Sequence, residues 1–167
     1  AVDNSKGNEA IIFDFHTGGG EVLAGQYLNN IIGSVQKPFI VVSDFLASAG
    51  IMGTLQSDAI IASGNYSEFG SVGVMTTVNK KLLAFLNENY ENVYSENSPD
   101  KNGNFEELKK GNKQPLIDHL TEIDNQFMSD VSKFRDLKGD EETIKKTLSG
   151  GMFTAQSALE RGLIDEI

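Results

Sequence analysis

The stretch that decides the fold is Lys37-Pro-Phe-Ile-Val-Val-Ser-Asp-Phe-Leu-Ala-Ser-Ala-Gly50. Residues 37–44 are rich in β-branched and aromatic side chains and are entered through a proline, which predicts a buried strand. A turn of small residues follows, and a helix is expected over 48–56. Ser48 therefore lies where a strand turns into a helix, with its hydroxyl at the sheet edge and free N–H groups behind it. Such a serine is either a nucleophile or the N-cap of the helix.

A glycine run, Thr17-Gly18-Gly19-Gly20, lies between an expected strand at 10–15 and an expected helix at 21–35. Glycines in this position allow the backbone to approach a ligand closely and leave N–H groups pointing outward. The spacing fits neither the dinucleotide-binding G-x-G-x-x-G pattern nor a phosphate-binding P-loop, which needs G-K-[ST]. Two interpretations stay open, an oxyanion hole and a plain tight turn.

Two further polar residues would matter if the fold brought them to Ser48. Ser71 belongs to a glycine-punctuated segment, Phe69-Gly-Ser-Val-Gly-Val-Met75, which predicts another buried strand. Lys101 lies in a polar loop over 95–104. A lysine in such a loop is normally solvated, and it gains a catalytic meaning only if the loop folds over Ser48.

Short motifs along the chain occur in an order that resembles the signal peptide peptidase A family of serine proteases, which includes phage and prophage head-maturation proteases. The motifs are His-Thr-Gly-Gly-Gly at 16–20, Lys-Pro at 37–38, Ala-Ser-Ala-Gly at 47–50, Ser-Asp-Ala-Ile at 57–60, Gly-Ser-Val-Gly-Val at 70–74 and Ala-Leu-Glu-Arg-Gly-Leu-Ile-Asp at 158–165. They cover nearly all of residues 10–167. The resemblance implies a Ser/Lys-dyad protease on an α/β fold of the Clp-protease or crotonase type, layered around a mostly parallel sheet.

The resemblance also implies a role for each residue that matches a family motif. Ser48 matches the nucleophile, and Lys101 matches the general base. Ser71 matches the serine that hydrogen-bonds the catalytic lysine in relatives. The expected oxyanion hole consists of Gly19 or Gly20 together with the N–H of Ala49.

The chain departs from the family pattern at two places. His16 stands where relatives often carry Asp or Asn, and the usual spacing before the lysine is stretched over 95–101. A lysine can take a proton from serine only when its amine is neutral, so Lys101 is expected to leave water when the site assembles. His16 stays open as an alternative base because it precedes the glycine run. His119 lies in an expected helix and is interpreted as a surface or interface residue.

Two other functional classes stay open. One is a catalytically inactive relative that serves as a scaffold or binding subunit, which the altered surroundings of Lys101 favour. The other is an acyl-CoA enzyme of the crotonase type, which would share a glycine-rich oxyanion hole. That class needs no serine nucleophile and usually employs carboxylates, so the Ala-Ser-Ala-Gly turn argues against it. A Ser/Lys peptidase is expected to need no cofactor and no metal.

Composition narrows the range of partners. The chain has 167 residues, 39% of them hydrophobic and 23% charged, which suits one domain with a substantial core. A net charge of −10 makes nucleic acid and anionic membranes poor partners. The family resemblance implies a peptide or protein substrate instead. The lack of cysteine excludes disulfides and thiolate metal sites. No apolar run approaches the length of a membrane span, and the sequence leaves the cellular location undetermined.

Alternating patterns predict a mostly parallel sheet with flanking helices. Strands are expected at 10–15, 38–44, 58–62, 71–76, 91–95 and 163–167. Helices are expected at 21–35, 48–56, 78–89, 105–136, 141–148 and 155–161, the fourth being kinked or split by Gly111 and Pro115. Residues 1–9 are polar and expected to fray, which leaves 10–167 as a single serine-protease core domain.

An apolar stripe at helical spacing follows the lysine loop and consists of Leu116, Leu120, Ile123, Phe127 and Val131. It either packs on its own sheet or forms an interface between copies. The resemblance favours the interface, because it implies a homo-oligomeric ring in which neighbouring subunits supply the serine and the lysine of one site.

Substrate-binding residues are not determined by the sequence. Phe45, Leu46, Ile51 and Met52 lie near Ser48 and either line an apolar pocket or belong to the core. The resemblance implies cleavage after small or apolar residues.

Overall fold

The computed structural model describes Gly7 and residues 9–167. The chain forms two compact units. The first unit runs through Gly73 and resumes over Gln126–Ile167, and the second unit is Val74–Asn125. The segment expected to fray, 1–9, lies outside the described residues except for Gly7 and Glu9. The expected single domain over 10–167 stays a prediction.

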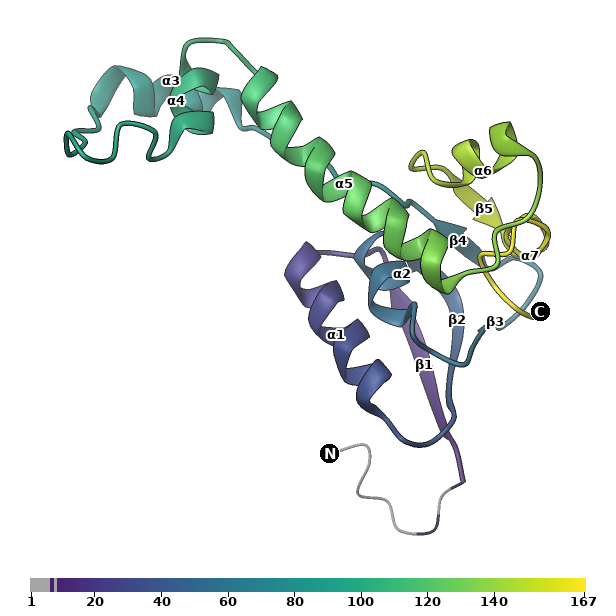
Figure 1. Cartoon of the computed structure of the whole chain (residues 1–167). Helices are drawn as coiled ribbons and strands as arrows, with labels where there is room; N and C mark the ends of the chain where they lie inside the picture. Colours follow the sequence, from purple (N-terminus) through teal and green to yellow (C-terminus); the bar gives the residue numbers. More distant parts are fainter. Residues whose placement is uncertain (1–6, 8) are drawn as a thin grey trace. The chain divides into compact units, whose positions relative to one another are not determined.

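The first unit is built on a sheet whose central strand ends at Ser48. Its strands are β1 (Ile11–Thr17), β2 (Phe39–Ala47), β3 (Ala59–Ala62), β4 (Glu68–Gly70) and β5 (Met152–Thr154). β2 pairs in parallel with β1 along one edge and with β3 and then β4 along the other, whereas β5 runs antiparallel to β4 (Figure 1). The expected α/β fold with a mostly parallel sheet is confirmed. Because β1, β2 and β4 run in one direction, their carboxyl ends meet at one edge of the sheet.

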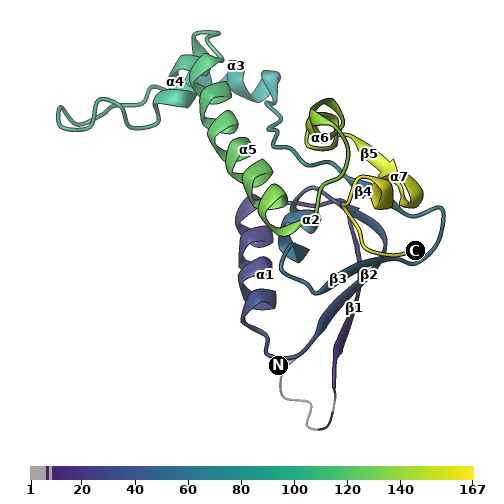
Figure 2. The same ribbon diagram turned by 45° about the vertical axis from the view of Figure 1, so that its right-hand side comes forward.

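One face of this sheet is covered by α1 (Val22–Ser34) and α2 (Ala49–Thr54), which lie on the same side of β1 and β2 in both views (Figures 1 and 2). Alternate residues of β2, beginning with Phe39 and Val41, are buried on the covered face, as the period of a strand requires. Ser43 is buried among them, and its hydroxyl donates to the Phe15 carbonyl of β1. The two helices pack closely because Gly25 has no side chain. A Cβ at that position would lie only 2.7 Å from the Ala49 carbonyl oxygen.

The C-terminal part of the first unit contains α6 (Glu141–Thr147), β5 and α7 (Ala155–Glu160). Asp165 fastens the chain end to the sheet, because its Oδ2 accepts the Ile60 N–H at 2.7 Å and pairs with the Arg135 guanidinium at 2.7 Å. The strand expected at 163–167 is wrong, since in that segment a single bridge joins Glu166 to Ile61. The chain end is therefore held by this carboxylate together with two backbone hydrogen bonds to β3, from Asp165 N–H to the Ile60 carbonyl at 2.8 Å and from Ala62 N–H to the Glu166 carbonyl at 2.9 Å.

The second unit contains α3 (Lys80–Asn89), α4 (Gly103–Lys109) and the start of α5 (Gln114–Phe134). The Glu106 carboxylate joins α4 to the segment before it by accepting from Asn92 Nδ2 at 2.6 Å and the Tyr94 hydroxyl at 2.7 Å. The Lys109 ammonium donates to it as well, at 3.1 Å. These hydrogen bonds stabilise the charged carboxylate and lower the pKa of Glu106 to about 2.

Two more expected strands are wrong. The first, 71–76, stops short because β4 ends at Gly70 and the positive φ of Ser71, 53°, turns the chain out of the ladder. The second, 91–95, has no strand beside it, since the elements of residues 74–125 are helices. An apolar alternating pattern needs a pairing edge to become a strand.

The helix expected over 105–136 is divided into α4 and α5, which confirms the predicted split. The break contains Gly111 with φ of 86°, and Pro115 lies in the first turn of α5, where a missing N–H costs no helical bond. Part of the apolar stripe on α5 is buried, since Phe127 and Val131 are 1% and 0% exposed. Leu116 at its other end is only half-buried. None of the helices in the described residues is both long and apolar enough to cross a membrane.

Candidate active site

Ser48 lies at the carboxyl end of β2 in a backbone conformation that few residues adopt. Its φ and ψ are 54° and −121°, outside the regions favoured by non-glycine residues. Its N–H donates to the Gly70 carbonyl at 2.9 Å, and its carbonyl accepts the Met52 N–H of α2 at 3.1 Å. The hydroxyl makes no capping bond to α2, so Ser48 occupies the N-cap position without acting as a side-chain cap. Strained strand-to-helix turns of this kind present the nucleophilic serines of α/β-hydrolases.

The glycine run packs directly against this serine. A Cβ at Gly19 would lie 2.7 Å from Ser48 Cβ, 2.9 Å from the Ala47 carbonyl oxygen and 3.0 Å from Ala49 N. Gly19 also has a φ of 101°, which disfavours any side chain. The predicted neighbours Gly19, Ser48 and Ala49 are therefore brought together by the fold. The close approach explains why a glycine is required there.

The hydrogen bonds distinguish the candidate oxyanion donors. The Gly19 N–H is already engaged, because it donates to Thr17 Oγ1 at 3.1 Å. Within the described part of the chain, the N–H groups of Gly20 and Ala49 donate to no protein acceptor. Ala49 is the first residue of α2, where the helix leaves such donors unsatisfied. Gly20 and Ala49 are the two donors that remain available for an anion.

Ser71 is a neighbour of Ser48 at the same sheet edge. Ala47 and Gly70 are paired in the β2–β4 ladder, and each serine is the residue that follows its paired neighbour. Ser71 also has a positive φ, 53°, and its N–H donates to the Gly151 carbonyl at 2.7 Å. Both serines are half-buried, with their side chains at the edge where the parallel strands end.

His16, the alternative base, is bound elsewhere. Its Nδ1 lies 2.6 Å from Asp44 Oδ1, and both side chains are mostly exposed, at 70% and 61%. The hydrogen bond from His16 lowers the pKa of Asp44. Since neighbouring residues of a strand point to opposite faces, His16 and Thr17 face opposite sides of β1, and Thr17 is the one that contacts Gly19.

Lys101 belongs to the second unit, whereas Ser48, Ser71 and the glycine run belong to the first. It is exposed, and its N–H donates to the Ser98 carbonyl at 3.2 Å in the turn before α4. Together with Tyr94 and Asn92 it lines a surface pocket of about 590 Å³ within the second unit. Its pairing with Ser48 stays a prediction.

A small cavity of about 130 Å³ adjoins Gly20 and Ala49, the candidate oxyanion donors. Sequence reasoning missed most of its lining, although the small residues on one face of α1 are a signal for a close approach. The lining consists of Phe15, Thr17, Gly19, Gly20, Glu21, Ala24, Gly25, Leu28, Ala49 and Gly50. Phe45, Leu46, Ile51 and Met52, which the sequence places either in an apolar pocket or in the core, do not line that cavity. Leu46 and Ile51 are core residues with 0% and 1% exposure.

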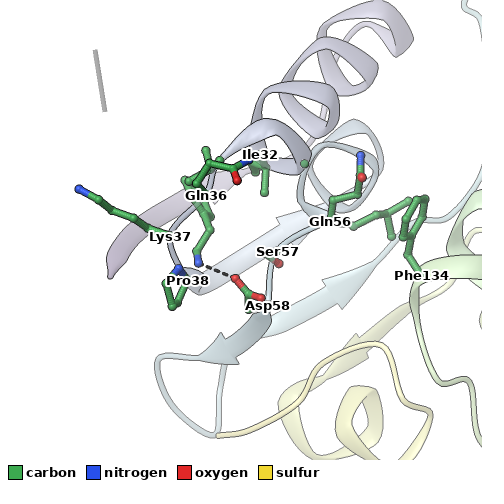
Figure 3. Close-up of a pocket in the computed structure, with 12 residues that line it drawn as sticks. Ile32, Gln36, Lys37, Pro38, Gln56, Ser57, Asp58 and Phe134 are labelled. Carbon is green, nitrogen blue, oxygen red and sulfur yellow. Dashed lines mark hydrogen bonds between the residues drawn. The ribbon is translucent and has the colours of Figure 1, made fainter. Parts of the chain in front are cut away.

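A larger pocket lies at the other end of the strands. Its volume is about 550 Å³, and it is lined by residues that precede β2 and β3, including Gln36, Lys37, Ser57 and Asp58 (Figure 3). Asp58 Oδ2 accepts the Phe39 N–H at 2.6 Å, which closes the entry of β2. The pocket contains no residue of the Ser48 site. In the described residues, no group of three or more metal-binding side chains is gathered at either place.

Comparison with known proteins identifies the family. The sequence model of peptidase family S49 matches residues 33–167, which include Ser48, Ser71 and Lys101. The chain belongs to peptidase family S49. The resemblance to the signal peptide peptidase A family is confirmed, and this S49 chain is a serine-type peptidase. Comparison with curated protein sequences finds no match.

Solved structures show the same fold. The S49 chain is similar to a ClpP1 mutant from Listeria monocytogenes, with 15% identity and a TM-score of 0.58, over 98% of this chain and 75% of that one. It is also similar to a mutant of the 1510-N membrane-bound stomatin-specific protease, with 18% identity and a TM-score of 0.59, over 95% of this chain and 63% of that one. The chain is similar as well to a second mutant of that protease, in complex with a substrate peptide. The identity is 18% and the TM-score 0.58, over 95% of this chain and 60% of that one. The Clp-protease-like fold is thereby confirmed.

Proposed function

We propose that this chain hydrolyses peptide bonds with Ser48 as the nucleophile. The observation that carries the proposal is the strained Ser48 turn packed against Gly19, with the free Ala49 N–H behind it. Strain of this size persists where surrounding structure enforces it, most often at functional sites. Here β2 on one side and the Gly70 carbonyl on the other hold the serine in place.

The proposed reaction follows from the placement of these groups. Ser48 Oγ attacks the substrate carbonyl carbon and loses its proton to a base, while the carbonyl oxygen takes up the negative charge. The N–H groups of Gly20 and Ala49 stabilise that oxyanion. The protonated base then gives its proton to the leaving amine, which leaves an acyl-enzyme on Ser48. Water, deprotonated by the same base, releases the acid and restores the serine.

Lys101 is the proposed base, in a dyad with Ser48. What supports it is the family membership together with the polar turn that presents the ammonium on the surface of the second unit. Ser71 is proposed to bind the lysine amine, since its hydroxyl shares an edge with Ser48 and makes no hydrogen bond to another described side chain. An amine becomes neutral more readily when it is removed from water, so assembly of the site is expected to activate it.

The proposed substrate is a peptide whose residue at the cleaved bond has a small side chain. The cavity beside the donors holds about 130 Å³, and glycine and alanine form much of its wall. Glu21 also lines this cavity and adds a negative charge to its surroundings, which disfavours an acidic side chain there.

The working form is proposed to be a homo-oligomer with shared sites. The two dyad residues belong to different units, and the second unit exposes Phe85, Tyr90 and Val93 by 52%, 62% and 90%. Exposed apolar groups of this size are typical of surfaces that bind a partner. Mixing Ser48→Ala chains with Lys101→Ala chains tests sharing directly, because only shared sites recover activity in the mixture. An active monomer, identified by light scattering, would exclude it.

A fluorophosphonate probe separates the peptidase from the inactive and crotonase-type alternatives. The probe is expected to label wild-type protein at Ser48, while Ser48→Ala protein stays unlabelled and loses peptide hydrolysis by on the order of 10⁶-fold. Ser132→Ala, which removes an exposed hydroxyl from α5, is the matched control and keeps both properties. Unchanged turnover in Ser48→Ala would refute the nucleophile, and unlabelled wild-type protein would favour an inactive relative.

A further inference from the structure

Thr17 contacts the site without taking part in any step of the proposed reaction. It is the last residue of β1 and pairs with Leu46 of β2, two residues before Ser48. The Gly19 N–H donates to its Oγ1 at 3.1 Å, and that oxygen lies 3.4 Å from the Gly19 carbonyl oxygen. One hydroxyl therefore closes a small ring across the glycine turn, as serine and threonine do in side-chain-stabilised turns.

The methyl branch of the same side chain packs on α2. A Cβ added to Gly50 would collide with Thr17 Cγ2, so the methyl group lies directly against the first turn of that helix. Gly50 is the residue after Ala49, whose N–H is one of the two free donors. Thr17 thus contacts both sides of the candidate oxyanion hole, the glycine turn through its oxygen and the helix through its methyl group.

The glycine turn needs such a contact because its backbone has little intrinsic preference. Three glycines in succession sample φ of either sign with little cost, and here Gly19 and Gly20 have φ values of 101° and 153°. Without a fixed partner, the peptide groups between them could rotate and point the Gly20 N–H away from Ser48. Donors stabilise an oxyanion well only when their direction is fixed before the reaction.

We propose that Thr17 is a positioning residue that orients the oxyanion hole. The inference rests on the proposed function, since it assigns a role within the same site. By occupying the Gly19 N–H, the hydroxyl fixes the turn and leaves Gly20 as the donor that faces the anion together with Ala49. The methyl group holds the distance between the turn and α2.

Two substitutions separate the hydroxyl from the shape of the side chain. Thr17→Val keeps the branched shape and removes the oxygen, whereas Thr17→Ser keeps the oxygen and removes the methyl group. Thr17→Val is expected to lower kcat by about 10- to 100-fold with KM unchanged, less than the roughly 10²- to 10³-fold loss of a whole donor. Thr17→Ser is expected to restore most of kcat. Thr121→Val, on the exposed surface of α5, is the matched control and keeps wild-type kcat.

A second measurement does not depend on turnover. Amide hydrogen exchange at Gly19 is expected to be slow in wild-type and Thr17→Ser protein and faster in Thr17→Val. Unchanged Gly19 exchange in Thr17→Val would overturn the proposal, and so would equal kcat losses in Thr17→Val and Thr17→Ser, which indicate packing alone. Failure of the proposed function looks different: wild-type protein then shows no turnover that depends on Ser48, while the exchange of Gly19 still decides whether Thr17 holds the turn.

Discussion

The two proposed dyad residues lie in regions of opposite construction. Ser48 follows a strand that is paired along both edges, and its neighbours Ala47 and Ala49 are 3% and 9% exposed. Lys101 lies within a turn in which residues 98–102 are all exposed. The fold thus holds the proposed nucleophile in place with a strained backbone and close packing. The position of the proposed base depends on an exposed surface turn.

The largest expected effect concerns that surface turn. Lys101→Ala is expected to lose peptide hydrolysis about as severely as Ser48→Ala, because residues that act as a unit are not additive. Lys101→Arg should stay inactive as well, since a guanidinium cannot give up its proton near neutral pH. Steady-state turnover on a peptide library measures both variants.

Lys110→Ala is the control for that experiment. Lys110 also belongs to the second unit, where its ammonium pairs with Glu107 at 2.7 Å, so its loss should leave turnover unchanged. Full activity in Lys101→Ala combined with loss in His16→Ala would move the base to His16 and reverse the contrast between the two regions.

A pair of glycine substitutions sharpens the contrast in backbone tolerance. Gly19→Ala is expected to lower kcat by at least about 10²-fold. The new Cβ would lie 2.7 Å from Ser48 Cβ and 3.0 Å from Ala49 N, so it would displace the proposed oxyanion donor at Ala49. Gly103→Ala, at the start of α4, meets nothing within 4 Å and should leave kcat and stability near wild type. Kinetics together with thermal unfolding measure both. Equal tolerance of the two substitutions would show that the Ser48 turn is not enforced by close packing.

The anchor of the chain end gives a smaller effect, on stability. Asp165→Asn removes the charge that pairs with Arg135, whose side chain is 6% exposed, and is expected to cost roughly 1–3 kcal/mol of unfolding free energy. Urea unfolding measures the change. Asp118→Asn, an exposed substitution on α5, is the control and should be nearly neutral. A neutral Asp165→Asn would mean that the carboxylate is dispensable for fastening the tail.

The smallest expected effect is a dependence on acid that is confined to the second unit. The pKa of Glu106 is lowered from 4.5 to about 2, so its stabilising hydrogen bonds are fully present above the unfolded pKa and are lost as the pH falls towards 2. Amide exchange in α4 should therefore rise between pH 4.5 and 2, and Glu106→Gln should remove most of that dependence. An equal rise in the β2 amides would contradict the confinement.

Local sequence predicted the first region better than the second. β-Branched residues, a proline at the entry and small residues at the exit specify β2, its turn and α2, and all three are present at Ser48. The strand expected at 71–76 is absent because the positive φ of Ser71 turns the chain out of the ladder. The strand expected at 91–95 is absent because the elements within residues 74–125 are helices. Pairing is a property of the whole fold, so apolar alternation alone could not predict it.

Within the site, sequence also predicted more of the chemistry than of its support. Ser48, Gly19 and Ala49 were named from motif and position, and the fold brings them together. The hydroxyl of Thr17, two residues before Gly19, is a sequence signal for a side-chain-stabilised turn that the motif comparison does not include. The union of Ser48 with Lys101 stays a prediction, because it depends on contacts between distant parts of the chain or between copies.

The hydrogen bonds behind Ser48 also set the order in which a working site can appear. The Ser48 N–H donates to the Gly70 carbonyl, and the N–H of Ser71, the residue after Gly70, donates to the Gly151 carbonyl. Backbone hydrogen bonds therefore link three segments that are far apart in the sequence. Such distant contacts form late and slowly compared with local ones. A chain that is still being synthesised, or one cut before Gly151, would contain Ser48 but would lack the second of these hydrogen bonds. In such a truncated chain the Gly151 carbonyl that accepts the Ser71 N–H is missing, so the backbone beside Ser48 is not yet fixed.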